Sequence, residues 1–208
     1  WIMSIYGISE NLYRLDENIE PQPWIAESVE TPDENTWVFT IRDGVTFSNG
    51  KTVDAKAVKA CFERTYEKNE RADSTLKIKS MEADGMKFTI VTPEPNPTLL
   101  NDLCDPLLGI YDATEEPDEE LGVSCTGPYV ATSFTAMTDV KMRANENYWG
   151  GAPKADTVEL KIIDDQDALD MANLAATVRL NKLAGADRFY LAFAKAAGDP
   201  FAQEGTVL

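Results

Sequence analysis

The segment WVFTIRDGVTFSNGKTVDAKAVKACFERT, from Trp37 to Thr65, decides the fold of this 208-residue chain. Residues 37–42 alternate large apolar side chains with smaller or polar ones, which is the period of a half-buried strand. Asp43–Gly44 supply a turn, a second extended segment begins at 45–47, and Asn49–Gly50 end it because both residues tolerate a positive φ. The segment therefore predicts two extended pieces joined by tight turns.

A helix is predicted directly after these turns. Asp54 is a residue type that caps helix N-termini, because its carboxylate accepts hydrogen bonds from the first backbone amides. Apolar and small side chains then recur at helical spacing and predict one buried face. These residues are Ala57, Val58, Cys61, Phe62 and Thr65.

The rest of the chain interleaves strands with short helices. Residues 81–92 read as a hairpin around Asp84–Gly85, and the prolines within 93–97 end its ladder because proline donates no backbone hydrogen bond. A short helix is predicted at 98–104. Further strands are predicted at 140–144 and 157–163. The expected fold class is thus α/β, or α+β with mixed sheets.

Two groups of residues are predicted to be structural. Trp24, Trp37 and Trp149 are expected to pack in or against the core, as large aromatic side chains usually do. Gly127 and Pro128 are expected to set a backbone turn.

The composition limits the classes of partner. The chain has 36 acidic and 19 basic residues, a net charge of −17, so it is not expected to bind nucleic acid or an anionic membrane surface. No apolar run approaches the roughly 18 residues that a membrane-spanning helix needs. With 43% apolar residues, the chain can bury a core in one or two domains.

The cysteines point to no metal or cofactor site. Cys61, Cys104 and Cys125 have no metal-ligand spacing, and the chain contains no histidine. We therefore expect no bound metal and no cofactor. Cys104 and Cys125 lie in loop-like contexts and are able to pair in an exported protein, while three free thiols are the alternative.

Two long blocks of sequence carry a family resemblance. SENLYRLDENIEPQPWIAESVETPDENTWVFTIRDGVTFSNG, residues 9–50, resembles the opening of the extracytoplasmic solute-binding proteins of peptide and nickel ABC importers, whose next helix ends in Glu-Arg as at 63–64 here. SCTGPYVATSFTAMTDVKMRANENYWGGAPKADTVELKIIDD, residues 124–165, is similar to the family's Gly-Thr-Gly-Pro-Tyr turn, its two strands and its Asn-x-x-Tyr-Trp-Gly-Gly-x-Pro signature. Cys125 replaces the usual first glycine of that turn.

The resemblance implies an architecture. It predicts a periplasmic binding protein-like II fold of the type II, or cluster C, class, with residues 1–171 as the N-terminal lobe. Residues 172–208 are then a remnant strand, at 188–194, and a tail of the same lobe. The family's second lobe has no counterpart in the sequence, so the chain is expected to be one lobe or an abbreviated form.

The resemblance also implies a function. Such proteins capture a small solute, here a peptide or a nickel chelate, by lobe closure and deliver it to a membrane permease of the ABC type. The chain is accordingly expected to be a monomer outside the cytoplasm, in the periplasm or as a cell-surface lipoprotein, and not an enzyme.

Five residues are the expected ligand contacts. Arg71 falls where the nickel-binding branch places an arginine that neutralises carboxylates of the chelate; its alternative role is a surface pair with Glu67 or Glu70. Where a second arginine is expected, the chain has an apolar run at 107–110. The complete expected set is Trp1, Met3, Arg71, Leu108 and Gly109.

Two other functions remain open from the sequence. A hydrolase would use paired carboxylates, either Asp102 with Asp105 or Asp164 with Asp167. A protein-interaction module would instead expose an apolar patch. That patch would carry Trp1, Met3 and residues 107–110.

Overall fold

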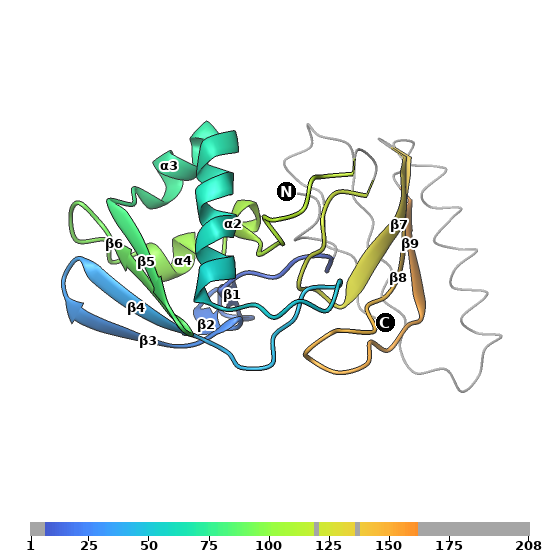
Figure 1. Cartoon of the computed structure of the whole chain (residues 1–208), viewed down its shortest axis with the longest axis horizontal. Coiled ribbons are helices and arrows are strands. Elements are labelled where there is room, and N and C mark those ends of the chain that lie inside the picture. Colours follow the sequence, from blue (N-terminus) through green and yellow to red (C-terminus); the bar gives the residue numbers. More distant parts are fainter. Residues whose placement is uncertain (1–6, 119–120, 136–137, 162–208) are drawn as a thin grey trace. The chain divides into compact units, whose positions relative to one another are not determined.

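The computed structural model of the chain describes residues 7–118, 121–135 and 138–161, and Figure 1 shows the order of their elements. The chain divides into two compact units. The first comprises residues 1–130 and 143–156, and the second comprises 131–142 and 157–208. The predicted strand at 188–194 and the predicted tail lie outside the described residues, so the boundary at residue 171 stays a prediction.

The first unit is built on a four-stranded antiparallel sheet. Its strands are β3 (Ala26–Asp33), β4 (Thr36–Ile41), β5 (Ser80–Asp84) and β6 (Lys87–Val91), in the order β3-β4-β6-β5. The strand predicted at 37–42 is confirmed as β4. The predicted hairpin is confirmed as β5 and β6, and its turn residue Gly85 has a positive φ of 56°. Both predictions succeed because local alternation and turn chemistry agree with the tertiary fold.

The predicted helix is confirmed as α2 (Ala55–Lys68). The Asp54 carboxylate accepts a hydrogen bond from the backbone N–H of Ala57 at 2.8 Å, as a helix cap should. The apolar face of α2 packs on β5 and β6, where the ring of Phe62 lies 5.3 Å from that of Phe88. A shorter helix, α3 (Glu70–Leu76), follows directly.

Short elements complete the first unit. A hairpin of β1 (Tyr13–Leu15) and β2 (Pro21–Pro23) pairs in antiparallel register. The helix predicted at 98–104 is present as the single turn α4 (Leu99–Asp102), and a 3-10 turn, η1 (Pro106–Leu108), comes after it. These elements pack against the core that the main sheet and α2 share.

A second sheet has the order β7-β8-β9. Its strands are β7 (Tyr129–Thr135), β8 (Asp139–Ala144) and β9 (Thr157–Lys161). The predicted strands at 140–144 and 157–163 correspond to β8 and β9. The fold class is therefore a mixture of helices and antiparallel sheets, as predicted. No helix within residues 7–118, 121–135 and 138–161 is long and apolar enough to cross a membrane.

The aromatic residues behave as predicted. Trp24, Trp37 and Trp149 are partly buried and pack against the core cluster. Gly127 lies in a bend, but the structure gives it a further constraint. A Cβ atom at Gly127 would lie 2.3 Å from the carbonyl oxygen of Gly7, so glycine is required there for close approach of two backbones.

Candidate functional site

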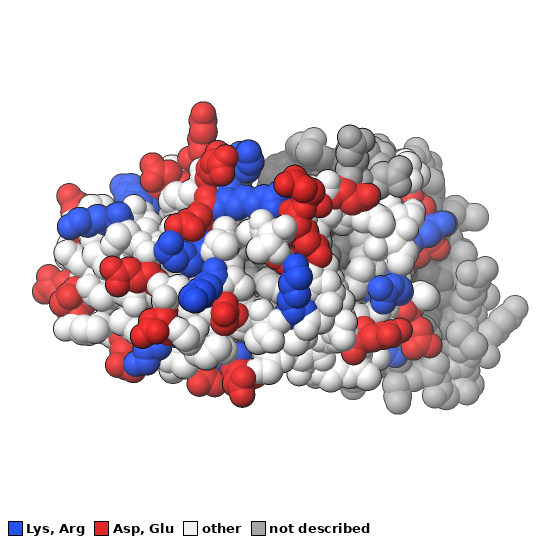
Figure 2. Space-filling model, viewed as in Figure 1, with Lys and Arg blue, Asp and Glu red and all other residues white. Residues whose placement is uncertain are grey.

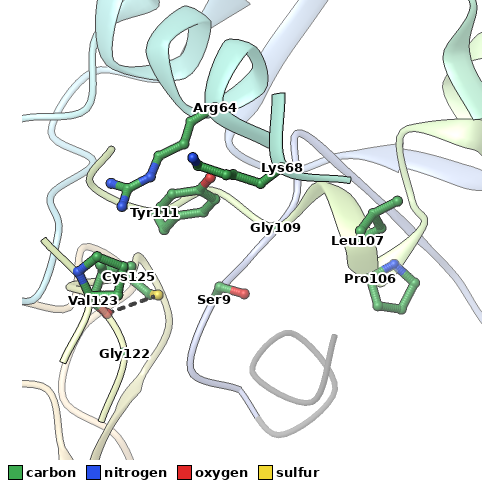
Figure 3. A pocket seen from close by; sticks show the side chains of 11 residues that line it. Ser9, Arg64, Lys68, Pro106, Leu107, Gly109, Tyr111, Gly122, Val123 and Cys125 are labelled. Atoms are coloured by element: carbon green, nitrogen blue, oxygen red, sulfur yellow. Dashed lines mark hydrogen bonds between the residues drawn. The ribbon is translucent and has the colours of Figure 1, made fainter. Parts of the chain in front are cut away.

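A cavity of about 390 Å³ opens on the first unit, within the range of small-molecule sites. It lies between the last turns of α2, η1 with the segment that follows it, and the segment before β7 (Figure 3). The residues that line it are Ser9, Arg64, Lys68, Pro106, Leu107, Gly109, Tyr111, Pro117, Gly122, Val123 and Cys125.

The local fold explains why these segments meet. Arg64 and Lys68 are four positions apart on α2 and therefore share one face of the helix. Tyr111 pairs with Cys125 in an antiparallel bridge, which joins the two segments of the opposite wall. Figure 3 shows Arg64 and Lys68 extending from the helix on the side of the cavity where Tyr111 lies.

The charge of the lining is opposite to that of the chain. Arg64 and Lys68 carry two positive charges, and none of the described residues that line the cavity is acidic. The chain as a whole has a net charge of −17, and Figure 2 shows acidic side chains spread over the visible face. The cavity is thus a local positive site on an acidic molecule, a setting that attracts anions.

Arg64 is held in place by the backbone. Its Nη1 donates to the carbonyl oxygens of Ala113 at 2.9 Å and Glu115 at 2.7 Å. Lys68 is much less constrained. Its Nζ lies 3.2 Å from the carboxylate of Glu67, and the two side chains are 68% and 71% exposed. An ion pair of that exposure contributes little, so Lys68 is able to turn towards a ligand.

Tyr111 is a neutral hydrogen-bonding group. Its hydroxyl lies 3.2 Å from the Thr65 hydroxyl, and burial raises the pKa of Tyr111 above its ordinary value. The phenol therefore keeps its proton at physiological pH.

Burial also raises the pKa of the two thiols near the cavity. The Cys61 sulfur donates to the Gly109 carbonyl at 3.6 Å and accepts from the backbone N–H of Tyr111 at 3.4 Å. Burial raises the pKa of Cys61 to about 12 and also raises the pKa of Cys125. Since thiolates are the nucleophiles and metal ligands, neither sulfur is prepared for such a role.

A polar cluster fixes the wall beside Tyr111. The carboxylate of Asp112 accepts hydrogen bonds from Lys51 at 2.7 Å, Asn49 at 2.9 Å and the Thr114 hydroxyl at 2.6 Å. Burial alone would raise the pKa of Asp112, but these hydrogen bonds outweigh it and hold the pKa well below its usual range. Within the described ranges, no group of three or more His, Cys, Asp or Glu side chains is arranged to hold a metal ion.

The expected ligand contacts among the described residues do not lie together in the structure. Gly109 lines the cavity, whereas Leu108 is 2% exposed and packs in the core. Arg71 lies on α3, 57% exposed, and its Nη2 is 2.7 Å from the carboxylate of Asp105. Its partner is therefore Asp105, and not the predicted Glu67 or Glu70. Trp1 and Met3 lie outside the described residues.

Sequence reasoning missed the cationic pair. In the sequence, Arg64 belongs to the family's Glu-Arg motif and Lys68 to no motif, so neither residue was among the expected ligand contacts. Helical spacing could have indicated that the two residues share one side of α2, because both fall beside its buried face, next to Cys61 and Thr65. Their meeting with Tyr111 and Val123 depends on pairing between distant segments, which local periodicity does not reveal.

The chain is similar in sequence and structure to known proteins. A family model described as bacterial extracellular solute-binding proteins, family 5, matches residues 20–200. The crystal structure of a nickel ABC transporter protein from Bacillus halodurans is similar, with 38% identity and a TM-score of 0.77 over 82% of this chain and 36% of that one.

Two further relatives show the range of named ligands. NikA from Staphylococcus aureus, crystallised with Ni(L-His)2, is 26% identical with a TM-score of 0.76, over 83% of this chain and 37% of that one. The glutathione-binding protein GsiB of Salmonella paratyphi A is 27% identical over 172 residues, 76% of this chain and 33% of the relative. The chain thus spans about a third of the length of the relatives it matches.

Proposed function

Because the chain belongs to the bacterial extracellular solute-binding proteins of family 5, we propose that it serves in the substrate-binding component of an ABC importer. One observation carries the proposal beyond the family assignment. The cavity beside α2 is concave, partly apolar and positively charged on a strongly acidic chain, which suits capture of a small charged solute.

The proposed solute is a peptide or a metal chelate. The relatives support both, since one was crystallised with Ni(L-His)2 and another is named for glutathione, which is a small peptide. Both kinds of solute carry carboxylates and amines around a compact body. Arg64, Lys68 and the Tyr111 hydroxyl are suited to such polar groups, while Leu107 and Val123 offer apolar contact.

The proposed mechanism is closure around the solute. A ligand that touches two lobes biases the equilibrium between open and closed forms by the free energy of those contacts. A single lobe should therefore bind its solute weakly. The partner would be a membrane permease that accepts the closed form, and the site of action would be outside the cytoplasm.

Titration with candidate solutes tests this function. Ni(L-His)2 and glutathione are titrated into the purified chain and, in parallel, into the full-length Bacillus halodurans relative, with binding followed by calorimetry and by native mass spectrometry. We expect weak binding by the chain that is saturable and specific for one of the two solutes. Absence of binding to both, by a folded chain, would contradict the proposal.

The two alternative functions receive less support. An apolar interaction patch at 107–110 is not favoured, because Leu108 and Ile110 are 2% and 0% exposed. A hydrolase with Asp102 and Asp105 is not favoured either. The Asp102 carboxylate accepts from Asn96 and Thr98, while that of Asp105 pairs with Arg71, and one relative named above is a nickel ABC transporter protein. The other pair, Asp164 and Asp167, lies outside the described residues.

A further inference from the structure

Two groups of cations near the cavity, among the described residues, are candidates to meet a solute carboxylate: Arg71 on α3, and the pair Arg64 and Lys68 on α2. Arg71 is already neutralised within the protein. Its Nη2 donates to Asp105 at 2.7 Å, and that carboxylate also accepts from the backbone N–H of Leu107 at 2.9 Å. A solute carboxylate at Arg71 would have to displace a partner that the local backbone holds in position.

The pair on α2 is differently placed. Both hydrogen bonds of Arg64 leave from Nη1 and end on backbone carbonyls, so its positive charge has no carboxylate partner among the described residues. The nearby carboxylate of Glu115 is engaged elsewhere, with the Ser124 backbone N–H at 2.8 Å and Asn49 at 2.7 Å. In the part of the chain that the structure describes, the ion pair of Lys68 is its exposed contact with Glu67.

We infer that Arg64 and Lys68, and not Arg71, receive the carboxylate of the solute on this lobe. Arg64 supplies a fixed guanidinium and Lys68 a movable ammonium group. The apolar wall of Leu107 and Val123 then contacts the hydrocarbon part of the same molecule. The inference rests on the proposed function, because it assumes that the solute enters this cavity.

The test uses a probe that does not require the natural solute to be known. Succinate is titrated into the isotope-labelled chain, and arginine Nε–H and lysine Nζ resonances are followed by NMR; succinamide, which is similar in shape and uncharged, is the ligand control. We expect saturable shifts at Arg64 and Lys68 with succinate alone. Arg71 and Arg143 report non-specific anion effects in the same spectra.

Variants make the assignment quantitative. Lys68→Gln should weaken succinate binding about tenfold, the loss expected for one charge-assisted hydrogen bond, whereas Arg71→Gln should change it less than twofold. Arg64→Lys keeps the charge and loses the Nη1 group that donates to the two carbonyls, so its melting temperature is measured alongside. Lys68 is exposed, so we expect its replacement to leave the fold intact.

Two results would overturn the inference. One is a response centred on Arg71 that Arg71→Gln abolishes; the other is no selective response of Arg64 or Lys68 up to millimolar succinate. Either result leaves the proposed function standing if the chain still binds Ni(L-His)2 or glutathione. Conversely, succinate binding at Arg64 and Lys68 without binding of either solute would count against the proposed function alone.

Discussion

The carboxylate of Glu10 accepts a hydrogen bond from the indole N–H of Trp149 at 2.7 Å, across 139 positions of sequence. Its other oxygen accepts from the Tyr148 hydroxyl at 2.8 Å. Trp149 also packs edge-on against Trp24, with ring centroids 5.3 Å apart, and the Arg14 guanidinium lies 3.4 Å from the Trp24 ring centre. The Tyr-Trp pair of the second sequence block thus fastens its loop to the segment before β1.

Removing the Glu10 acceptor should destabilise the first unit. Glu10→Ala leaves the Tyr148 hydroxyl and the Trp149 indole without their acceptor, which we expect to cost about 2–4 kcal/mol of unfolding free energy. Glu10→Gln keeps one acceptor oxygen and removes a partly buried charge, so its cost at neutral pH should stay within about 1 kcal/mol. Urea denaturation of the two variants checks the difference, and equal losses would contradict it.

The same carboxyl group should also shape the pH dependence of stability. Burial raises the pKa of Glu10 above its ordinary value, and the hydrogen bonds from Tyr148 and Trp149 offset this only in part. The folded state then binds the proton more tightly than the unfolded state. The contribution of Glu10 is therefore most favourable below the unfolded pKa of about 4.3 and is lost as pH rises through the folded pKa. The pH profile of Glu10→Gln should lack this component.

Asp112 should show the opposite dependence. Because its pKa is held below the ordinary value, its stabilising contribution is full above about pH 4 and is lost as pH falls through the folded pKa. Asp112→Asn should cost about 2–3 kcal/mol at neutral pH, since Lys51 and Asn49 lose a charged acceptor. The difference from the wild type should shrink in acid. Glu116→Gln, an exposed change on the same segment, is the control and should be nearly neutral.

Ile19 is a position where a smaller residue should stabilise the protein. It has a φ of 64°, which is strained for a β-branched side chain, and it is 72% exposed, so little burial is lost on replacement. Ile19→Gly should raise the unfolding free energy by about 0.5–1 kcal/mol, the relief of strain less the entropy cost of glycine. Ile19→Ala retains a Cβ atom and should gain less. If the Ile19→Gly variant melted at a lower temperature than the Ile19→Ala variant, the backbone at Ile19 would not be strained.

Much of the first unit was predictable because the residues that determine its strands, helix and turns lie within those elements or next to them. The alternation in Trp37–Ile41, the cap at Asp54 and the turn at Gly85 each lie within a few residues of the structure they specify. The sequence patterns therefore gave β4, α2 and the β5–β6 hairpin with nearly correct bounds. The helix predicted at 98–104 came out as one turn, because Cys104 and its neighbours turn away toward η1.

The candidate site was harder to predict because its parts are distant in sequence. Arg71 matched a family position, yet its charge is met by Asp105, 34 residues later. Leu108 matched the expected loop, but its side chain turns inward to the core. Only a tertiary structure reveals which of several cations has a carboxylate partner, since that depends on how loops cross rather than on residue type.

Gly127 illustrates a constraint of space and not of dihedral angle. A Cβ atom there would also lie 2.7 Å from the Ile8 carbonyl group, and backbone atoms cannot move aside as a flexible side chain can. Gly127→Ala should therefore cost about 3 kcal/mol, at the upper end for overpacking. Gly44→Ala is the matched control, because Gly44 has a φ of 80° with no neighbour within 4 Å and should cost only about 1–2 kcal/mol. Equal losses of unfolding free energy in the two variants would contradict the close contact at Gly127.

The state of the cysteines gives the last prediction. Cys61, Cys104 and Cys125 are free thiols in the structure, which favours the second of the two alternatives that the sequence left open. In the native protein, burial raises the pKa of Cys104 to about 11, and its sulfur is only partly accessible. An alkylating reagent near neutral pH should therefore label Cys104 slowly and the two buried thiols only on unfolding, because the thiolate is the reactive form.

Mass spectrometry counts the labels. Three alkyl groups should be added in denaturant without reductant, and the native protein should acquire its first label at Cys104. A single label in denaturant that becomes three after reduction would instead establish a disulfide. Rapid native labelling of Cys125 would mean that the wall beside the cavity opens, which would contradict a fixed cavity next to Arg64 and Lys68.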